Sequence, residues 1–358
     1  MFFFLGVVIG IVLVISALYW FFVMNTTVVT KMYNSSASAG DFWTITSDSV
    51  AKTIAYKNTT SGATGLVTFT VNADGTYDVT DTTGNITGAL EIPGYQIVLT
   101  ATKAGPNNNT PALITGITAG PTGVSSTSSA NYNYMQFRVN NGGFDAGYVH
   151  MVNGAITHGG FSPSQQNPID QPQTVNLLPS GAVLNPTYIQ VVDNTSTPPE
   201  TVTIFGSANG FLTVDQSNGT IVCMLQSASA AFDASFAKTY TGLFYGKPTA
   251  STNNNNSETG TVSMGKCSIV VTAAALVTVT NLTTKATMFS GTIAPISANT
   301  SIVGAGLVTD NCNGLFLCTS GSQQFLISFH AQTALFASYT ALTNPNYGYF
   351  YGSALSAN

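Results

Sequence analysis

The sequence contains very little charge. Only 6% of its 358 residues are charged, whereas an ordinary soluble domain carries about 25%. The net charge is −5, and the basic residues are eight lysines and Arg138, which are scattered along the chain. Nucleic-acid binding requires clustered cations that neutralise phosphates. We therefore do not expect nucleic acid among the partners of this protein.

Cysteine is also scarce, with four residues at 223, 267, 312 and 318 and no CxxC motif. No histidine lies at ligand spacing from them, so a zinc site is not expected. Their even number suggests two disulfides on an oxidised face, Cys312 with Cys318 and Cys223 with Cys267. The alternative is four buried thiols in a reducing compartment.

Catalytic motifs are absent. We find no GxSxG motif, no cysteine and histidine in a suggestive context, and no carboxylates paired beside aromatics. We therefore expect no enzymatic activity, no catalytic residues and no cofactor.

Two groups of residues are candidate metal ligands, and we interpret both as structural residues instead. His150 and His158 flank a probable turn and could face one another, but isolated strand histidines are far commoner than metal ligands. Asp74, Asp78 and Asp81 lie on one hairpin without the spacing of a calcium loop, which favours a solvated hairpin. We predict no metal site.

The residues that are abundant indicate an ordered β-rich protein. The chain has 21 Phe and 15 Tyr, which disordered segments lack. Alternation over 64–72 and 76–81, around the turn 73–75, predicts a hairpin, and 133–140 with 146–152 predicts another. We predict a mainly β fold, with one or two antiparallel β-sandwich or jelly-roll-like domains after an N-terminal transmembrane helix.

The transmembrane prediction rests on residues 2–23, which carry no charge. As a helix they would extend about 33 Å, which matches a bilayer core of about 30 Å. Gly6 and Gly10 form a GxxxG pair through which another helix could approach closely. A cleaved signal peptide would need a basic start and a shorter apolar core. We therefore expect a retained, single-pass anchor that contacts the lipid bilayer.

The predicted domain plan follows the composition. Residues 1–24 form the anchor, 25–40 a stalk and 41–162 a first β domain. Residues 163–199 hold seven of the 14 prolines, which indicates a linker or extended arm over 163–200. Residues 201–358 form a second β domain.

A short motif occurs twice. Residues 242–246 and 348–352 both read GxFYG. This phrase resembles the closing strands of small β-barrels in transferrin-binding-protein-like surface lipoproteins, which implies β structure at both places. The acidic residue and glycine pair that follow in that family are missing after Gly352.

Asn-x-Ser/Thr sequons are numerous, and each marks a glycosylation site if the body meets a glycosylation system. They begin at Asn25, Asn34, Asn58, Asn85, Asn108, Asn194, Asn218, Asn255, Asn281 and Asn299.

This layout suggests a structural role. The whole chain resembles, in composition and layout, the membrane-anchored minor capsid proteins of large icosahedral viruses with an internal lipid layer. The resemblance implies a virion location, other capsid or surface-lattice proteins as partners, and a link between shell and membrane. One alternative is a cell-surface filament subunit or adhesin whose strands are completed by a neighbour's extended segment. Another is an ectoenzyme that acts on surface glycans.

Overall fold

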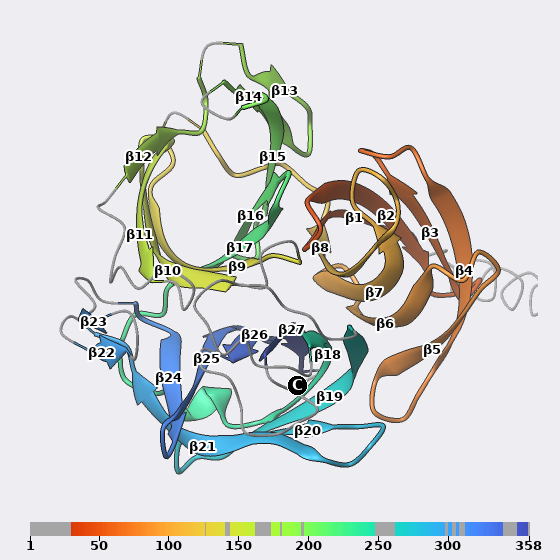
Figure 1. Cartoon of the computed structure of the whole chain (residues 1–358). Helices are drawn as coiled ribbons and strands as arrows, with labels where there is room; N and C mark the ends of the chain where they lie inside the picture. The colour runs from red at the N-terminus through yellow and green to blue at the C-terminus, as the bar shows by residue number, and fades with distance from the viewer. Residues whose placement is uncertain are drawn as a thin grey trace, which may run out of the picture.

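The structure is a computed structural model. It describes residues 30–125, 127–139, 144–161, 173–179, 181–194, 197–247, 262–297, 300–302, 306–307, 312–338 and 349–356. These residues form three successive β modules, which Figure 1 shows around a common centre.

The first module, barrel 1, is a closed barrel of eight antiparallel strands in sequence order, and it closes where its first strand pairs with its last. Its strands are β1 (Thr30–Ala37), β2 (Asp41–Asp48), β3 (Thr53–Asn58), β4 (Thr64–Val71), β5 (Thr76–Asp81), β6 (Ile86–Ile92), β7 (Gln96–Ala104) and β8 (Thr110–Thr118). Burial alternates along β3, where Ile54 and Tyr56 are buried and Ala55 and Lys57 are exposed. This is the pattern of a wall with one face inside a barrel.

The second module, the curled sheet, has nine antiparallel strands in the order β12-β11-β10-β9-β17-β16-β15-β14-β13. Its strands are β9 (Ala130–Phe137), β10 (Phe144–Val152), β11 (Ala155–Phe161), β12 (Gln173–Asn176), β13 (Val183–Leu184), β14 (Ile189–Asp193), β15 (Glu200–Ser207), β16 (Phe211–Gln216) and β17 (Gly219–Leu225). The first strand, β9, pairs with the last, β17, at the centre of the sheet. The two edges are therefore β12 and β13, which follow one another along the chain.

The third module, barrel 2, is a second closed barrel of eight antiparallel strands, preceded by the short 3₁₀ helix η1 (Ala234–Phe236). Its strands are β18 (Thr239–Lys247), β19 (Ser263–Val271), β20 (Leu276–Asn281), β21 (Thr287–Pro295), β24 (Leu315–Ser320), β25 (Gln323–His330), β26 (Thr333–Ser338) and β27 (Tyr349–Leu355), with the pair β22 (Ser301–Ile302) and β23 (Gly306–Leu307) between β21 and β24. A cluster rich in phenylalanine, including Phe244, Phe325 and Phe336, forms its core. The first GxFYG motif lies on β18, and residues 349–352 of the second lie on β27, which pairs with β18 where the barrel closes. The expectation of β structure at both motifs is confirmed.

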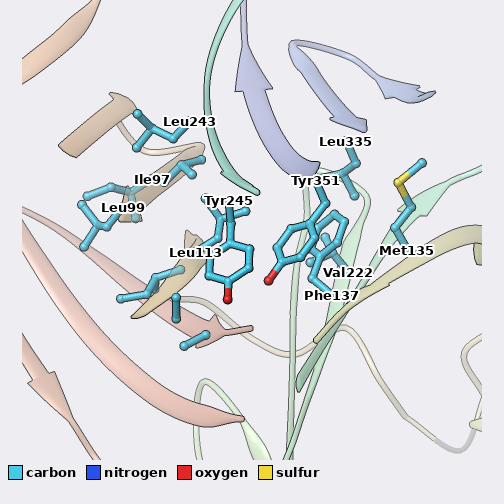
Figure 2. Close-up of a cluster of buried hydrophobic side chains, with 14 of the residues drawn as sticks. Ile97, Leu99, Leu113, Met135, Phe137, Val222, Leu243, Tyr245, Leu335 and Tyr351 are labelled. Carbon is cyan, nitrogen blue, oxygen red and sulfur yellow. The ribbon is translucent and has the colours of Figure 1, made fainter. Parts of the chain in front are cut away.

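One hydrophobic cluster joins the three modules. Figure 2 shows side chains from barrel 1, the curled sheet and barrel 2 converging there, among them Leu113, Phe137 and Tyr351. Phe137 stacks on Tyr351 with ring centroids 4.8 Å apart, and Tyr351 stacks on Tyr245 at 5.1 Å. Because shared apolar burial is the main stabilising term in folding, the modules form one packed body.

The predicted fold class is wrong in its architecture. The strands form two closed barrels and one open, curled sheet, and they do not form sandwiches or jelly rolls. Alternating burial is common to both architectures, because one face of each strand points to a core in either case. The closing pairs β1–β8 and β18–β27 join strands that are far apart in sequence, and the alternation of burial along each strand does not specify them.

The transmembrane and single-pass predictions are also corrected. Among the residues that the structure describes, no helix is both long enough and apolar enough to cross a membrane. The predicted anchor at 1–24, with Gly6 and Gly10, lies outside the described residues. We do not carry a single-pass membrane localisation further.

The domain plan also differs from the three modules. Residues 30–37 of the predicted stalk form β1 of barrel 1. The predicted Pro-rich linker contributes β12, β13 and β14 to the curled sheet. None of these three strands contains a proline, and the described prolines of the stretch, at 179, 186, 198 and 199, lie outside them.

Candidate functional site

The curled sheet has two different faces, set by the alternation of side chains along each strand. On β9, Met135 and Phe137 pack into the cluster that joins the modules, whereas Tyr134 and Gln136 point the other way. On β17, Val222 faces the joining cluster, and Ile221 and Cys223 face the opposite side. We call this second, inward face the concave face.

The concave face surrounds a cavity of about 480 Å³. Its lining comes from both halves of the sheet, with Ile156 of β11 on one side and Val191 of β14 on the other. Val149, Ile204 and Leu212 are buried and belong to a separate small core around the cavity. A volume of this size is in the range of small-molecule sites.

One end of the cavity is polar. The Arg138 guanidinium donates to an Asp145 carboxylate oxygen at 2.5 Å and to the side-chain oxygen of Gln136. Gln136 in turn donates to Gln216 at 3.0 Å. The Nε of Arg138 is buried and has no acceptor among the described residues. The only arginine of the chain is therefore held against Gln136 and Asp145 in the cavity wall.

The curled sheet has two open edges. Among the described strands, β12 pairs only with β11 and β13 pairs only with β14. Because all neighbours are antiparallel and the strand count is odd, these two edge strands run in the same direction. One further strand that runs the other way could pair antiparallel with either edge. At one of them, Val183 and Leu184 are 57% and 70% exposed.

A second hollow, of about 750 Å³, lies between barrel 1 and the curled sheet, lined by residues such as Phe42, Glu200 and Asp215. Burial raises the pKa of Asp215 well above its ordinary value, and the charges of Asp41 and Glu200 act in the same direction. Asp215 accepts a hydrogen bond from the Ser36 hydroxyl at 2.6 Å. A general acid must reach the leaving group of its substrate, and the carboxyl of Asp215 is turned into the contact with barrel 1. The arrangement serves packing better than catalysis.

The cysteines do not form the predicted pairs. All four are buried thiols in the structure. Cys312 packs in the cluster that joins the modules, whereas Cys318 lies in the core of barrel 2. Cys223 lies on the concave face and Cys267 in barrel 2. The two cysteines of each predicted pair thus lie in different cores. Neither closeness in sequence nor an even number of cysteines predicted the pairing correctly.

The histidines and aspartates considered as metal ligands do not converge. His158 pairs in register with Val149, which places His150 on the opposite face of the sheet. Asp74 caps its own turn, and Asp78 forms an ion pair of 2.8 Å with Lys266 of barrel 2. Within the described part of the chain, no group of three or more His, Cys, Asp or Glu side chains could hold a metal ion.

The sequons fall into three groups. Four of the asparagines are buried, at 34, 58, 85 and 281. Asn58 and Asn281, for example, accept two backbone N–H bonds each and so form turns at strand ends. A folded chain cannot present them to a glycosylation enzyme. Asn194 and Asn218 are exposed and Asn108 is half-buried, while Asn25, Asn255 and Asn299 lie outside the described residues.

The sequence matches no family profile and no curated protein.

Solved structures give low-similarity matches. One is the transferrin binding protein B of Haemophilus parasuis, with TM-score 0.24 and 6% identity over 91% of this chain and 76% of that chain. Another is a putative DNA polymerase III β subunit of Eubacterium rectale, with TM-score 0.14, 10% identity, and coverage of 73% and 90%. A third is AztD of Citrobacter koseri, with TM-score 0.13, 9% identity, and coverage of 92% and 99%. These TM-scores are too low to indicate a shared fold, and no argument rests on them.

The sequence did not predict the cavity, although two signals for it were present. Arg138 is the only arginine, and it directly follows β9, in which polar Gln136 alternates with apolar Met135 and Phe137. An isolated arginine in a chain so poor in charge indicates a buried partner. The partner itself, Asp145, is brought near by the register of β9 and β10.

Proposed function

We propose that this protein is a non-enzymatic structural subunit that joins a surface lattice by pairing strands of other chains with the open edges of its curled sheet. The observation that supports this proposal is the contrast between the modules. The two barrels are closed, whereas among the described strands β12 and β13 of the curled sheet have one neighbour each. An open edge is a template for another chain.

The residues at one edge support this proposal. Proteins that avoid edge pairing place charges, especially lysine, on such strands. Here β13 carries Val183 and Leu184, and the neighbouring strand β14 adds Val192, which is 57% exposed. An exposed apolar edge suits burial against a partner strand.

The proposed setting is a virion shell, where partners would be other capsid proteins. The low charge and the polar, uncharged surface agree with a lattice component that contacts protein on several sides. A surface filament would use the same edge, so the assembly in which the chain is found separates these two settings.

The test compares two variants that place the same charge on the open edge of the curled sheet and on the outside of closed barrel 1. Leu184→Lys puts a lysine on the open edge, and Leu66→Lys puts one at a site on barrel 1 that is 57% exposed. Each full-length variant is produced in the native system, and its copies per purified particle are counted by quantitative mass spectrometry.

We expect the number of Leu66→Lys copies per particle to equal that of the unchanged chain. The number of Leu184→Lys copies per particle should be at least tenfold lower. Equal incorporation of both variants would contradict strand pairing at β13. A chain that purifies alone, as a monomer with hydrolase activity on glycans, would contradict the structural role itself.

A further inference from the structure

The curled sheet has room in its hydrogen-bond pattern for one more strand. Among the described strands its two edges are β12 and β13, which run in the same direction. Figure 1 shows the sheet curling round so that these two ends come back towards each other. A tenth strand that runs the opposite way could pair antiparallel with both edges at once. It would close this sheet, as the sheets of the two barrels are closed.

The cavity of about 480 Å³ lies between the same two ends of the sheet. Its lining includes Leu177, which directly follows β12, and Val191 of β14. Much of its wall is aliphatic and buried, with Val149, Ile204 and Leu212 among the residues. Protein interiors seldom leave voids larger than a water molecule, and wall atoms that face one lack dispersion partners. Side chains on the inner face of a tenth strand would supply those partners.

The polar residues of the lining do not call for a further partner. Arg138 forms an ion pair with Asp145 at 2.5 Å. Asp193 and His158 are also engaged in interactions of their own. The unfilled space therefore borders an aliphatic wall, and apolar side chains are what would complete it.

The chain contains a segment of this chemistry that lies outside the described residues. Residues 2–23 carry no charge, and 7–15 read VVIGIVLVI. Seven of these nine residues are valine or isoleucine, which favour strands. Side chains alternate between the two faces of a strand. The odd positions, 7 to 15, are all bulky, whereas the even ones include Gly10, so the odd face is the one suited to filling a cavity.

The direction of β1 favours a segment from another copy. The Asn34 side chain donates to the Thr187 carbonyl at 2.8 Å, just after β13 ends. The Ser38 carbonyl accepts from the Val139 N–H at 3.0 Å, just after β9 ends. Because β9 and β13 run in opposite directions, these contacts mark opposite ends of the sheet. Thr30 therefore lies towards the end at which β13 finishes.

A tenth strand antiparallel to β13 would finish at the other end of the sheet. A segment of the same chain would then have to return along the whole height of the sheet to reach β1. A segment from another copy meets no such constraint. Residues 16–29, which would join it to its own β1, can extend over about 46 Å.

We propose that residues 7–15 of a second copy of this chain insert between β12 and β13 as the tenth strand, with Ile9, Ile11 and Leu13 in the cavity. This inference rests on the proposed function, since it names the strand that the open edges receive. The surface that donates and the surface that accepts are different, so the contact is head-to-tail and can continue from copy to copy.

The experiment identifies the segment beside β13 by photo-cross-linking. A full-length chain with p-benzoylphenylalanine in place of Leu184 also carries Ser16→Ala as a mass label. It is produced in the native system with an excess of the unchanged chain, and purified particles are irradiated. Trypsin leaves residues 1–31 in one peptide, because Lys31 is the first basic residue. The control carries the photoreactive residue in place of Leu66, on closed barrel 1.

We expect position 184 to be joined to residues 7–15, and most of that peptide to carry Ser16, which marks it as coming from another copy. The Leu66 control should give no such product. Cross-links only to the lighter peptide of the Ser16→Ala chain would overturn donation by a second copy. A cross-link from position 184 to a different protein would overturn this inference but leave the proposed function standing. No cross-link to any chain would contradict both.

Two further variants test which face of the segment is inserted. Ile11→Lys places a charge on the odd face, and Val12→Lys places the same charge on the even face. Each replaces the unchanged chain as donor, and the yield of the cross-link is measured per donor copy in the particle. We expect Ile11→Lys to lower the yield at least tenfold and Val12→Lys to lower it less than twofold. Equal effects of the two variants would contradict insertion as a strand with the odd face in the cavity.

Discussion

Tyr351 of barrel 2 stacks on Phe137 of the curled sheet, with ring planes only 9° from parallel. Tyr351 also stacks on Tyr245, its register partner across β18 and β27. The seam that closes barrel 2 is thus the surface that meets the curled sheet. Figure 2 shows these three aromatic residues within the cluster that joins the modules.

The first prediction concerns this stack. Phe137→Ala should lower the free energy of unfolding by about 3–5 kcal/mol, since it removes a fully buried ring. A double-mutant cycle with Tyr351→Ala should give a coupling of about 0.5–1.5 kcal/mol. Urea denaturation followed by fluorescence measures both values.

Leu66→Ala serves as the control, because Leu66 is exposed and its loss should change stability by no more than about 0.5 kcal/mol. Strict additivity of the Phe137 and Tyr351 effects would mean that the two rings do not support one another.

The second prediction concerns Gly352, the last glycine of the second GxFYG motif. A Cβ there would lie 2.3 Å from the Leu243 carbonyl oxygen and 2.2 Å from a Phe336 ring carbon. Because backbone cannot yield as a side chain can, Gly352→Ala should destabilise barrel 2 by about 1–3 kcal/mol. Thermal unfolding by circular dichroism measures the loss.

Gly120→Ala is the matched control, since a Cβ at Gly120 meets nothing within 4 Å. If both variants melt at the temperature of the unchanged protein, the close approach of β18, β26 and β27 is not required for stability.

The third prediction concerns pH. Burial raises the pKa of Asp41 to about 6, and hydrogen bonds from Trp43 and Asn58 oppose that shift only in part. In this case the folded chain binds the proton more tightly than the unfolded chain does. Stability is therefore greatest below the ordinary pKa near 3.8 and falls as the pH rises towards 6. For Asp41 alone the difference is about 3 kcal/mol.

We expect the urea midpoint to rise as the pH is lowered from 7 to 4.5. Asp41→Asn and Asp215→Asn should each flatten this slope, since burial raises the pKa of both carboxyls. Asp233→Asn should leave the slope unchanged, because hydrogen bonds from Ser235 lower the pKa of that exposed carboxyl, which therefore lies below the pH range tested. A midpoint that falls with acid in this range would contradict the prediction.

The fourth prediction concerns the thiols. Burial raises the pKa of Cys223 to about 12 and that of Cys318 well above its ordinary value. Thiolates are the reactive form, so Ellman's reagent should react slowly with the native chain. After unfolding without a reductant, all four cysteines should react. Two or fewer reactive thiols would indicate disulfides instead.

Some features follow from local sequence alone. The alternation over 64–72 and 76–81 predicts the hairpin that appears as β4 and β5, because burying one face of a strand requires that period. The repeated GxFYG predicts β structure at both places, which the structure confirms in β18 and β27. These are properties of segments shorter than ten residues.

Less of the candidate site could be predicted from the sequence. Arg138 and Asp145 are seven residues apart, and their contact depends on the register of β9 and β10. The cavity also needs Val191, which lies within the proline-rich stretch that composition assigns to a linker, and Ile204, which follows that stretch. Short strands can alternate with proline-containing loops, so a high proline content over a stretch does not exclude strands within it.

The sequence by itself determined that this chain is β-rich, almost without charge, and free of a clustered basic surface. Those properties depend only on which residues are present and on their period along the chain. The tertiary structure alone decided that two sheets close and one stays open, that four cysteines lie in separate cores, and that one arginine meets a cavity. Each of these depends on pairing between strands distant in sequence, and such pairing follows from the packing of the whole chain rather than from any local pattern.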